Sequence, residues 1–113
     1  MLARLNRIVR SDDYRSIVRS GRRASTRHVV VYMRTGLAER PARVGFIVSK
    51  AVGNAVRRNL VRRRFKAAVS VLVADIAPGT DIVIRALPAA AQASWATLNT
   101  EITQVLRKGM ARA

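Results

Sequence analysis

The sequence has no cysteine, a single histidine and few acidic residues, 6 Asp and Glu in 113 positions. The absence of cysteine excludes disulfides and thiolate metal sites, and one histidine makes a zinc site implausible. A two-metal nuclease centre needs several converging carboxylates, but the acidic residues are dispersed. They are Asp12, Asp13, Glu39, Asp75, Asp81 and Glu101. We therefore predict no catalytic side chain and no metal site in the chain itself.

The sequence also lacks a long hydrophobic run. No stretch approaches the roughly 20 apolar residues of a membrane-spanning helix. Arg, Ser and Asp interrupt the basic N-terminal region, which argues against a signal peptide. Half of the residues are nonetheless hydrophobic, enough for a core in a chain of this length. We expect a cytoplasmic protein with one domain, residues 1–113.

Positive charge is the most pronounced feature that is present: 22 Lys and Arg give a formal net charge of +16. Between Tyr14 and Ala74 the only acidic residue is Glu39, so internal salt bridges do not account for the charge there. Self-repulsion of this size opposes a compact state unless a polyanion neutralises it. RNA, DNA and an anionic membrane surface are the candidate partners.

Hydrophobic periodicity predicts an α+β or split β-α-β domain with the order helix, strand, strand, helix, strand, helix. The first helix is expected to begin with Ser11 as its cap and to end at Gly21. The first two strands are expected to pair as a hairpin, and the apolar run of the third indicates burial on both faces. The remaining expected elements are strands 28–34, 43–49 and 81–87, a helix over 54–74 and a last helix capped by Ser94.

The segment 49–66, SKAVGNAVRRNLVRRRFK, contains Lys and Arg but no acid. Helical geometry aligns Arg58, Arg62 and Lys66 at intervals of four residues. Like charges at this spacing destabilise an isolated helix, so their clustering favours a helix that docks on a phosphate backbone. Asn54 can cap this helix. The candidate RNA-binding residues are Lys50, Asn54, Arg57, Arg58, Asn59, Arg62, Arg63, Arg64 and Lys66.

The stretch from Arg43 to Asn59, RVGFIVSKAVGNAVRRN, resembles the bacterial ribonuclease P protein family. The resemblance extends to an Arg-rich start, the pair Asp13 and Tyr14, the strand VVVY and the late strand IVIRALP. It implies the small subunit of a ribonucleoprotein endoribonuclease that removes the 5′ leader from precursor tRNA. In that family the RNA subunit is the catalyst and binds most of the Mg²⁺, so the resemblance implies catalytic RNA and precursor tRNA as partners and a protein that is monomeric within the holoenzyme.

The same resemblance implies details of fold and site. The fold would be a two-layer α-β sandwich, similar to a ribosomal protein, with a left-handed β-α-β crossover that departs from the usual right-handed rule. A cleft between the first helix and the sheet would hold the single-stranded leader. Its residues would be Tyr14, Val18 and Tyr32. Aromatic rings in such a cleft can stack on unpaired bases.

Two positions depart from the family pattern. Leu60 stands where the third residue of an Arg-Asn-Arg signature is expected, and Arg64 stands where an apolar residue is usual. We hypothesise that the charge has moved one helical turn, from position 60 to 64. Val18 replaces an aromatic residue in the cleft, so leader contact is expected to depend more on Tyr14 and Tyr32.

Two other functions are consistent with the composition. A ribosomal or general RNA-binding structural protein would share the charge, the size and the fold class, but it would lack the string from Val48 to Asn59. A membrane-surface protein with a basic amphipathic helix would need many Trp, Phe or Leu residues opposite the charges. Here the opposite face has the Val, Phe, Ala and Leu residues that the core requires.

Overall fold

The computed structural model describes residues 6–36 and 39–111, with side chains to residue 109. Arg4, part of the Arg-rich start, lies outside these residues. Three α-helices, four strands and three short 3-10 helices occur within them. In chain order they are α1 (Ser11–Ser20), β1 (Arg22–Ser25), β2 (Val29–Thr35), β3 (Arg43–Ile47), η2 (Lys50–Val52), α2 (Ala55–Leu72), η3 (Val73–Asp75), β4 (Thr80–Ala86), η4 (Pro88–Gln92) and α3 (Trp95–Ala111).

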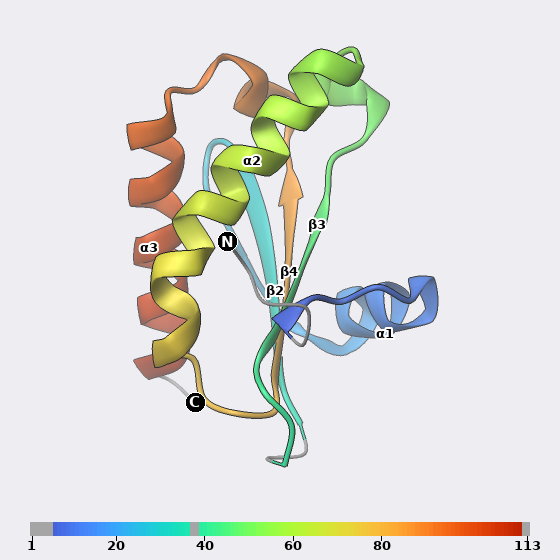
Figure 1. Cartoon of the computed structure of the whole chain (residues 1–113), viewed down its shortest axis with the longest axis vertical. Helices are drawn as coiled ribbons and strands as arrows, with labels where there is room; N and C mark the ends of the chain where they lie inside the picture. Colours follow the sequence, from blue (N-terminus) through green and yellow to red (C-terminus); the bar gives the residue numbers. More distant parts are fainter. Residues whose placement is uncertain (1–5, 37–38, 112–113) are drawn as a thin grey trace.

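The four strands form one mixed sheet with the order β1-β2-β4-β3 (Figure 1). β4 pairs antiparallel with β2 and parallel with β3. The expected hairpin between the strands now seen as β2 and β3 is therefore wrong. β4 is the most buried strand, with every residue except Arg85 buried, and it is covered on both faces as predicted, so it takes the central position between them. β1 was not predicted, because RRAS is polar and fully exposed at the sheet edge.

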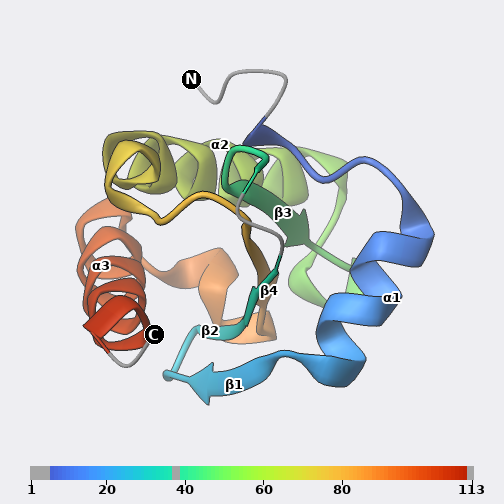
Figure 2. The ribbon, with the colours of Figure 1, turned by 90° about the horizontal axis from the view of Figure 1, so that it is seen from below.

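Helices cover both faces of the sheet (Figure 2). α2 and α3 pack on one face over a large core that includes Phe65, Ile84 and Leu98. α1 packs on the other face, where Ile17 contacts a smaller cluster with Val30 and Val83. The expected two-layer sandwich therefore lacks one layer. The apolar side of α1 covers the second face of the sheet, because α2 and α3 already occupy the first. The α+β class and the six expected elements are confirmed.

Polar caps fix the helix starts that matter for the site. The side chain of Asn54 accepts a hydrogen bond from the backbone N–H of Arg57 at 3.0 Å, so it caps α2 as predicted. Ser94 likewise accepts from the N–H of Thr97 at 3.1 Å at the start of α3. At α1, Arg10 holds the cap position without a side-chain bond, and Ser11 is the first helical residue rather than the cap.

Candidate nucleic-acid interface

The turn that leads into α2 depends on a glycine. Gly53 has a φ of 152°, a conformation that side chains rarely adopt. A Cβ atom at Gly53 would also lie 3.1 Å from Cδ of Arg57. The short helix η2 before it leaves Lys50 exposed. The loop and the first turn of α2 therefore present Lys50, Asn54 and Arg57 together at one end of the helix.

Exposed cations line the solvent side of α2. Arg57, Arg63 and Lys66 are exposed, as is Asn59. A shallow hollow on this side is lined by Val56, Asn59, Arg62, Arg63 and Lys66. Its lining has three cations and no acidic residue, so an extended polyanion fits it better than a neutral ligand does.

Arg62 is held in place by two contacts with the protein. Its guanidinium donates to Oδ1 of Asn59 at 3.1 Å and to the backbone carbonyl of Val48 at 3.4 Å. These contacts reduce the rotamer freedom that a free arginine would lose on binding an anion. Asn59, which the sequence analysis gave as a candidate RNA-binding residue, therefore orients a neighbouring cation.

Arg58 and Arg64 differ from the exposed cations. Arg58 is half-buried, and within the described residues its buried Nε has no hydrogen-bond partner. Arg64 is half-buried and donates to the backbone carbonyl of Ala93 at 2.7 Å, which ties α2 to the segment before α3. The structure thus gives Arg64 an intramolecular contact, while the hypothesis that it replaces a cation at Leu60 stays a prediction.

A second hollow lies between the N-terminal segment, α1, β3 and α2. Its lining residues are Arg7, Ile8, Val9, Tyr14, Val44, Gly45, Phe46, Arg62 and Lys66. The Tyr14 hydroxyl donates to the carbonyl of Ile8 at 3.1 Å and accepts from the N–H of Phe46 at 3.3 Å. Burial raises the pKa of Tyr14 above its ordinary value, although the Phe46 N–H and Arg62 act in the opposite direction. The hydroxyl therefore stays protonated and can keep both bonds at neutral pH.

The other two expected cleft residues lie deeper. Tyr32 is only 6% exposed and belongs to the core beneath α1. Val18 is half-buried and packs against the same core. Of the three, Tyr14 lines the second hollow, whereas Tyr32 and Val18 support α1 on the sheet.

Arg85 is a candidate that the sequence analysis missed. It is exposed on the central strand β4, between Val30 of β2 and Ile47 of β3. Strand alternation places it on the same face as Asp81 and Val83, the face on which α1 packs. The signal in the sequence was one arginine in the otherwise apolar run IVIRAL, where a fully buried strand would have no charge.

Within the described residues, no three acidic or histidine side chains lie together as a cation site would require. The most buried carboxylate, Asp81, is already bound by three arginines. No helix in this part of the chain combines the length and the apolar character needed to cross a membrane.

Known proteins are similar to this chain over nearly its whole length. The sequence model of the family Ribonuclease P matches residues 2–109. A ribonuclease P protein component from Clavibacter michiganensis is 49% identical over 110 residues, which is 97% of each chain. One from an Arthrobacter species is 48% identical over 112 residues, 99% of this chain and 82% of that one.

Solved structures show the same architecture. The RNase P protein of Staphylococcus aureus has a TM-score of 0.82 and 28% identity, with 92% of this chain and 94% of that chain covered. The protein from Thermotoga maritima has a TM-score of 0.78 at 21% identity, with 90% and 96% covered, and supports the fold alone.

Proposed function

Because the chain belongs to the bacterial ribonuclease P protein family, and is thus the protein component of the endoribonuclease that matures tRNA 5′ ends, we propose that α2 docks on the catalytic RNA and that the hollow beside Tyr14 receives the 5′ leader of precursor tRNA. The observation that carries this proposal is that the two hollows have lining residues in common. Arg62 and Lys66 line both the hollow on α2 and the hollow beside Tyr14.

The docking surface for the catalytic RNA is the basic side of α2 with the loop before it. Exposed cations there neutralise phosphates and release counterions, so affinity falls steeply with salt. Asn54 contributes through the cap that starts the helix, and Asn59 through Arg62. The proposed contact residues are Lys50, Asn54, Arg57, Arg58, Asn59, Arg62, Arg63, Arg64 and Lys66, with Arg64 the weakest of them because of its bond to Ala93.

The leader binds in the cleft between α1 and the sheet. Tyr14 provides an aromatic face in the hollow, and unpaired bases stack on such faces for roughly 1–3 kcal/mol each. Tyr32 of β2 and Val18 of α1 shape the cleft from below, because they pack together between the helix and the sheet. Arg85 adds a cation on the same sheet face and contacts the phosphates of the leader.

Mg²⁺ belongs to the RNA subunit in this proposal. The described residues do not fit a metal ion, because their one deeply buried carboxylate is paired with arginines and the other acids are apart. The protein's contribution is binding and orientation. Its positive surface reduces the repulsion between the catalytic RNA and the substrate, so less Mg²⁺ is needed for them to approach.

Four further properties complete the proposal. The chain acts as one RNA-binding unit over residues 1–113, is monomeric within the holoenzyme and works in the cytoplasm. The connection from β3 through α2 to β4 is left-handed. In support, β3 and β4 both run upward in Figure 1, and α2, which connects them, lies in front of the sheet. The chain passes from β3 on the right to β4 on the left, and with the helix in front this direction is that of a left-handed crossover.

A reconstitution assay tests the function. Purified protein, a bacterial ribonuclease P RNA and a precursor tRNA with a labelled 5′ leader are combined at low Mg²⁺. We expect cleavage at the mature 5′ end only when protein and RNA are both present. Tight RNA binding without stimulated cleavage would contradict the proposal and favour a general RNA-binding role.

A charge-matched pair of variants tests the surface. The double variant Arg63→Ala, Lys66→Ala removes two cations from α2, and Arg107→Ala, Lys108→Ala removes two exposed cations from α3. Only the first is expected to weaken binding to the catalytic RNA strongly. Equal losses would mean that net charge, rather than this helix, determines binding.

A further inference from the structure

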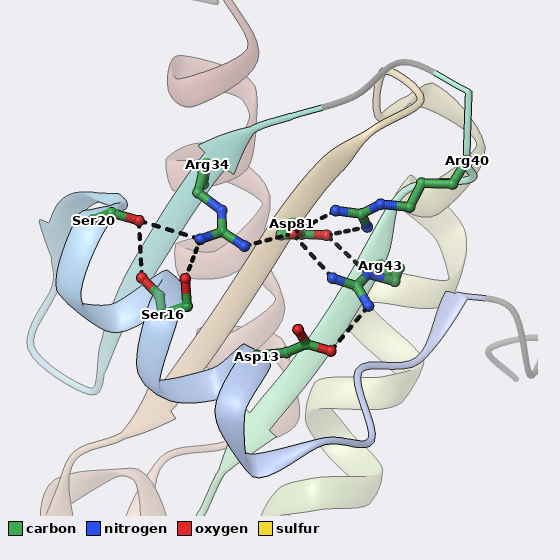
Figure 3. Close-up of polar contacts among 7 residues, drawn as sticks. All are labelled: Asp13, Ser16, Ser20, Arg34, Arg40, Arg43 and Asp81. Carbon is green, nitrogen blue, oxygen red and sulfur yellow. Dashed lines mark hydrogen bonds and ion pairs between the residues drawn. The ribbon is translucent and has the colours of Figure 1, made fainter.

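Asp81 is a carboxylate buried at the start of the central strand β4. It is 0% exposed and binds three arginines that come from three different parts of the chain (Figure 3). Arg40 donates to its two oxygens at 2.7 and 2.9 Å, and Arg43 at 3.0 and 3.1 Å. Arg34 donates to it at 3.1 Å. The register places Arg34 and Arg43 directly opposite Asp81 on the two neighbouring strands.

The positive charge of the three arginines keeps the Asp81 carboxylate ionised. Burial by itself would raise the pKa of Asp81, but the hydrogen bonds from Arg40, Arg43 and Arg34 outweigh burial and hold that pKa well below its usual range. Each arginine remains partly exposed, with 21–36% of its side chain accessible. The carboxylate therefore fixes three guanidinium groups whose other nitrogens remain available for further contacts.

Two of these arginines also hold α1. Arg34 donates to the hydroxyl of Ser16 at 2.6 Å and to that of Ser20 at 3.3 Å. Arg43 donates to the carboxylate of Asp13 at 3.2 Å. Figure 3 shows these bonds reaching from both sides of Asp81 to the one helix. Asp81 itself does not touch α1, so its effect on the helix passes through Arg34 and Arg43.

Apolar packing alone gives α1 a weak positional constraint. Ile17 is the one fully buried residue of this helix, and the partly buried Tyr14 and Val18 pack beside it. These three side chains form a small apolar contact that leaves the tilt of the helix to be set by polar bonds. The polar contacts at Asp13, Ser16 and Ser20 occupy two turns of the same side. Together with the two hydroxyl bonds of Tyr14, they define the angle of α1 on the sheet and the position of the Tyr14 ring.

We propose that Asp81 is a positioning residue for substrate recognition: through Arg34 and Arg43 it fixes α1 on the sheet and so sets the geometry of the cleft beside Tyr14. This inference rests on the proposed binding of the leader in that cleft. Asp81 touches no RNA, and its role is separate from the docking of α2 on the catalytic RNA.

Asp81→Asn tests the proposal, and Asp75→Asn is its matched control. Both substitutions remove one negative charge, but Asp75 is exposed in η3. With catalytic RNA present, we expect Asp81→Asn to weaken binding of a precursor with a long leader by roughly tenfold, equivalent to about 1.4 kcal/mol. Affinity for the catalytic RNA alone and for mature tRNA in the holoenzyme is expected to remain within about twofold, as is every value for Asp75→Asn. Equal losses for all ligands would overturn the proposal.

A second readout measures the position of α1 directly. The chain has no native cysteine, so Arg19→Cys on α1 and Thr100→Cys on α3 can carry a pair of spin labels. We expect a narrow distance distribution that broadens with Asp81→Asn and stays narrow with Asp75→Asn. An unchanged distribution with Asp81→Asn would refute the positioning role, because α1 would then be fixed without the carboxylate.

Variants on α1 keep the test decisive if Asp81→Asn does not fold. Asp13→Ala combined with Ser16→Ala and Ser20→Ala leaves Asp81 and its arginines intact but removes their contacts with the helix. The same selective loss of leader binding is expected. Substrates with different leader lengths distinguish the positioning role of Asp81 from the binding of the leader in the cleft. If the wild type binds long-leader and leaderless substrates equally, the leader cleft itself is refuted, whereas leader dependence that survives in the α1 variant refutes only the positioning role.

Discussion

Gly45 of β3 lies directly beneath the ring of Tyr14. A Cβ atom at position 45 would be 2.5 Å from Cε1 of Tyr14, closer than any real carbon contact. The ring is also fixed at its far end, where its hydroxyl bonds Ile8 and Phe46. The aromatic face in the cleft therefore depends on the absence of one side chain from the neighbouring strand.

Gly45→Ala is expected to displace Tyr14 and to destabilise the fold by about 1–3 kcal/mol, the usual cost of overpacking. Long-leader binding should weaken at the same time, as measured by titration of the holoenzyme with labelled precursor. The double variant Gly45→Ala, Tyr14→Ala removes the clash and should lose less stability than the sum of the losses of the two single variants. Additive losses in this cycle would show that the two residues are not coupled.

Arg63 and Arg64 are neighbours, but their substitutions are expected to affect different properties: RNA binding for Arg63 and stability for Arg64. Arg63→Ala should reduce the slope of log affinity for catalytic RNA against log salt by about 0.9, the contribution of one phosphate contact. Arg64→Ala should leave that slope nearly unchanged but lower thermal stability by about 1 kcal/mol, because it removes the hydrogen bond to the Ala93 carbonyl. If Arg64→Ala changes the slope as much as Arg63→Ala, the charge that the family has at position 60 has indeed moved one turn.

Arg85→Gln tests the cation that the sequence analysis missed. The side chain is exposed, so the free energy of unfolding should change by less than about 0.5 kcal/mol. Binding of a long-leader precursor should weaken by about threefold to tenfold, and binding of a leaderless one should not. The exposed Arg107→Gln is the matched control, and an equal effect from it would point to charge alone.

Glu101 of α3 holds the turn between β1 and β2. It accepts hydrogen bonds from the Thr26 hydroxyl and the His28 backbone N–H, and its second oxygen pairs with the His28 ring. Burial raises the pKa of Glu101, but the bonds from Thr26 and His28 lower it more, so the net shift is downward. Its stabilising effect is therefore complete above the ordinary Glu pKa of about 4.3 and is lost as the pH falls through the lower folded value.

Glu101→Gln is thus expected to lower stability at pH 7 by about 1–2 kcal/mol and to lose less stability than the wild type when the solution is acidified. Thermal melts from pH 7 to pH 3 measure both quantities, and the two proteins should converge at the acidic end. A constant difference across this range would contradict the assigned role of the carboxylate.

Local patterns in the sequence predicted the elements well, and non-local pairing poorly. The cap at Asn54 and the hydrophobic periodicity of residues 54–74 depend on neighbours within a few residues, so α2 could be predicted closely. The place of β4 between β2 and β3 depends on which strand is most buried from both sides, a property of the assembled sheet. The pairing of His28 with Glu101 could not be predicted either, because the two residues are 73 positions apart in the sequence.

The candidate site shows the same difference between local features, which the sequence predicts, and contacts between distant residues, which it does not. The sequence identified the cations of α2, because charge and helical period are local. It could not separate Arg64 from Arg63, since the difference is the carbonyl of Ala93 on another segment. Asp81 appeared as one of six scattered acids, and only the fold brings Arg34, Arg40 and Arg43 to it.

The outer strand β1 has a consequence for the protein before it meets RNA. β1 lies at the edge of the sheet, and all four of its residues are exposed, Arg22 and Arg23 among them. An open edge strand is a template for pairing with another molecule and for aggregation, and charged side chains there oppose it. Two copies that joined edge to edge would bring four guanidinium groups along one ladder. The arginines of β1 therefore oppose the edge-to-edge association of two copies of the protein.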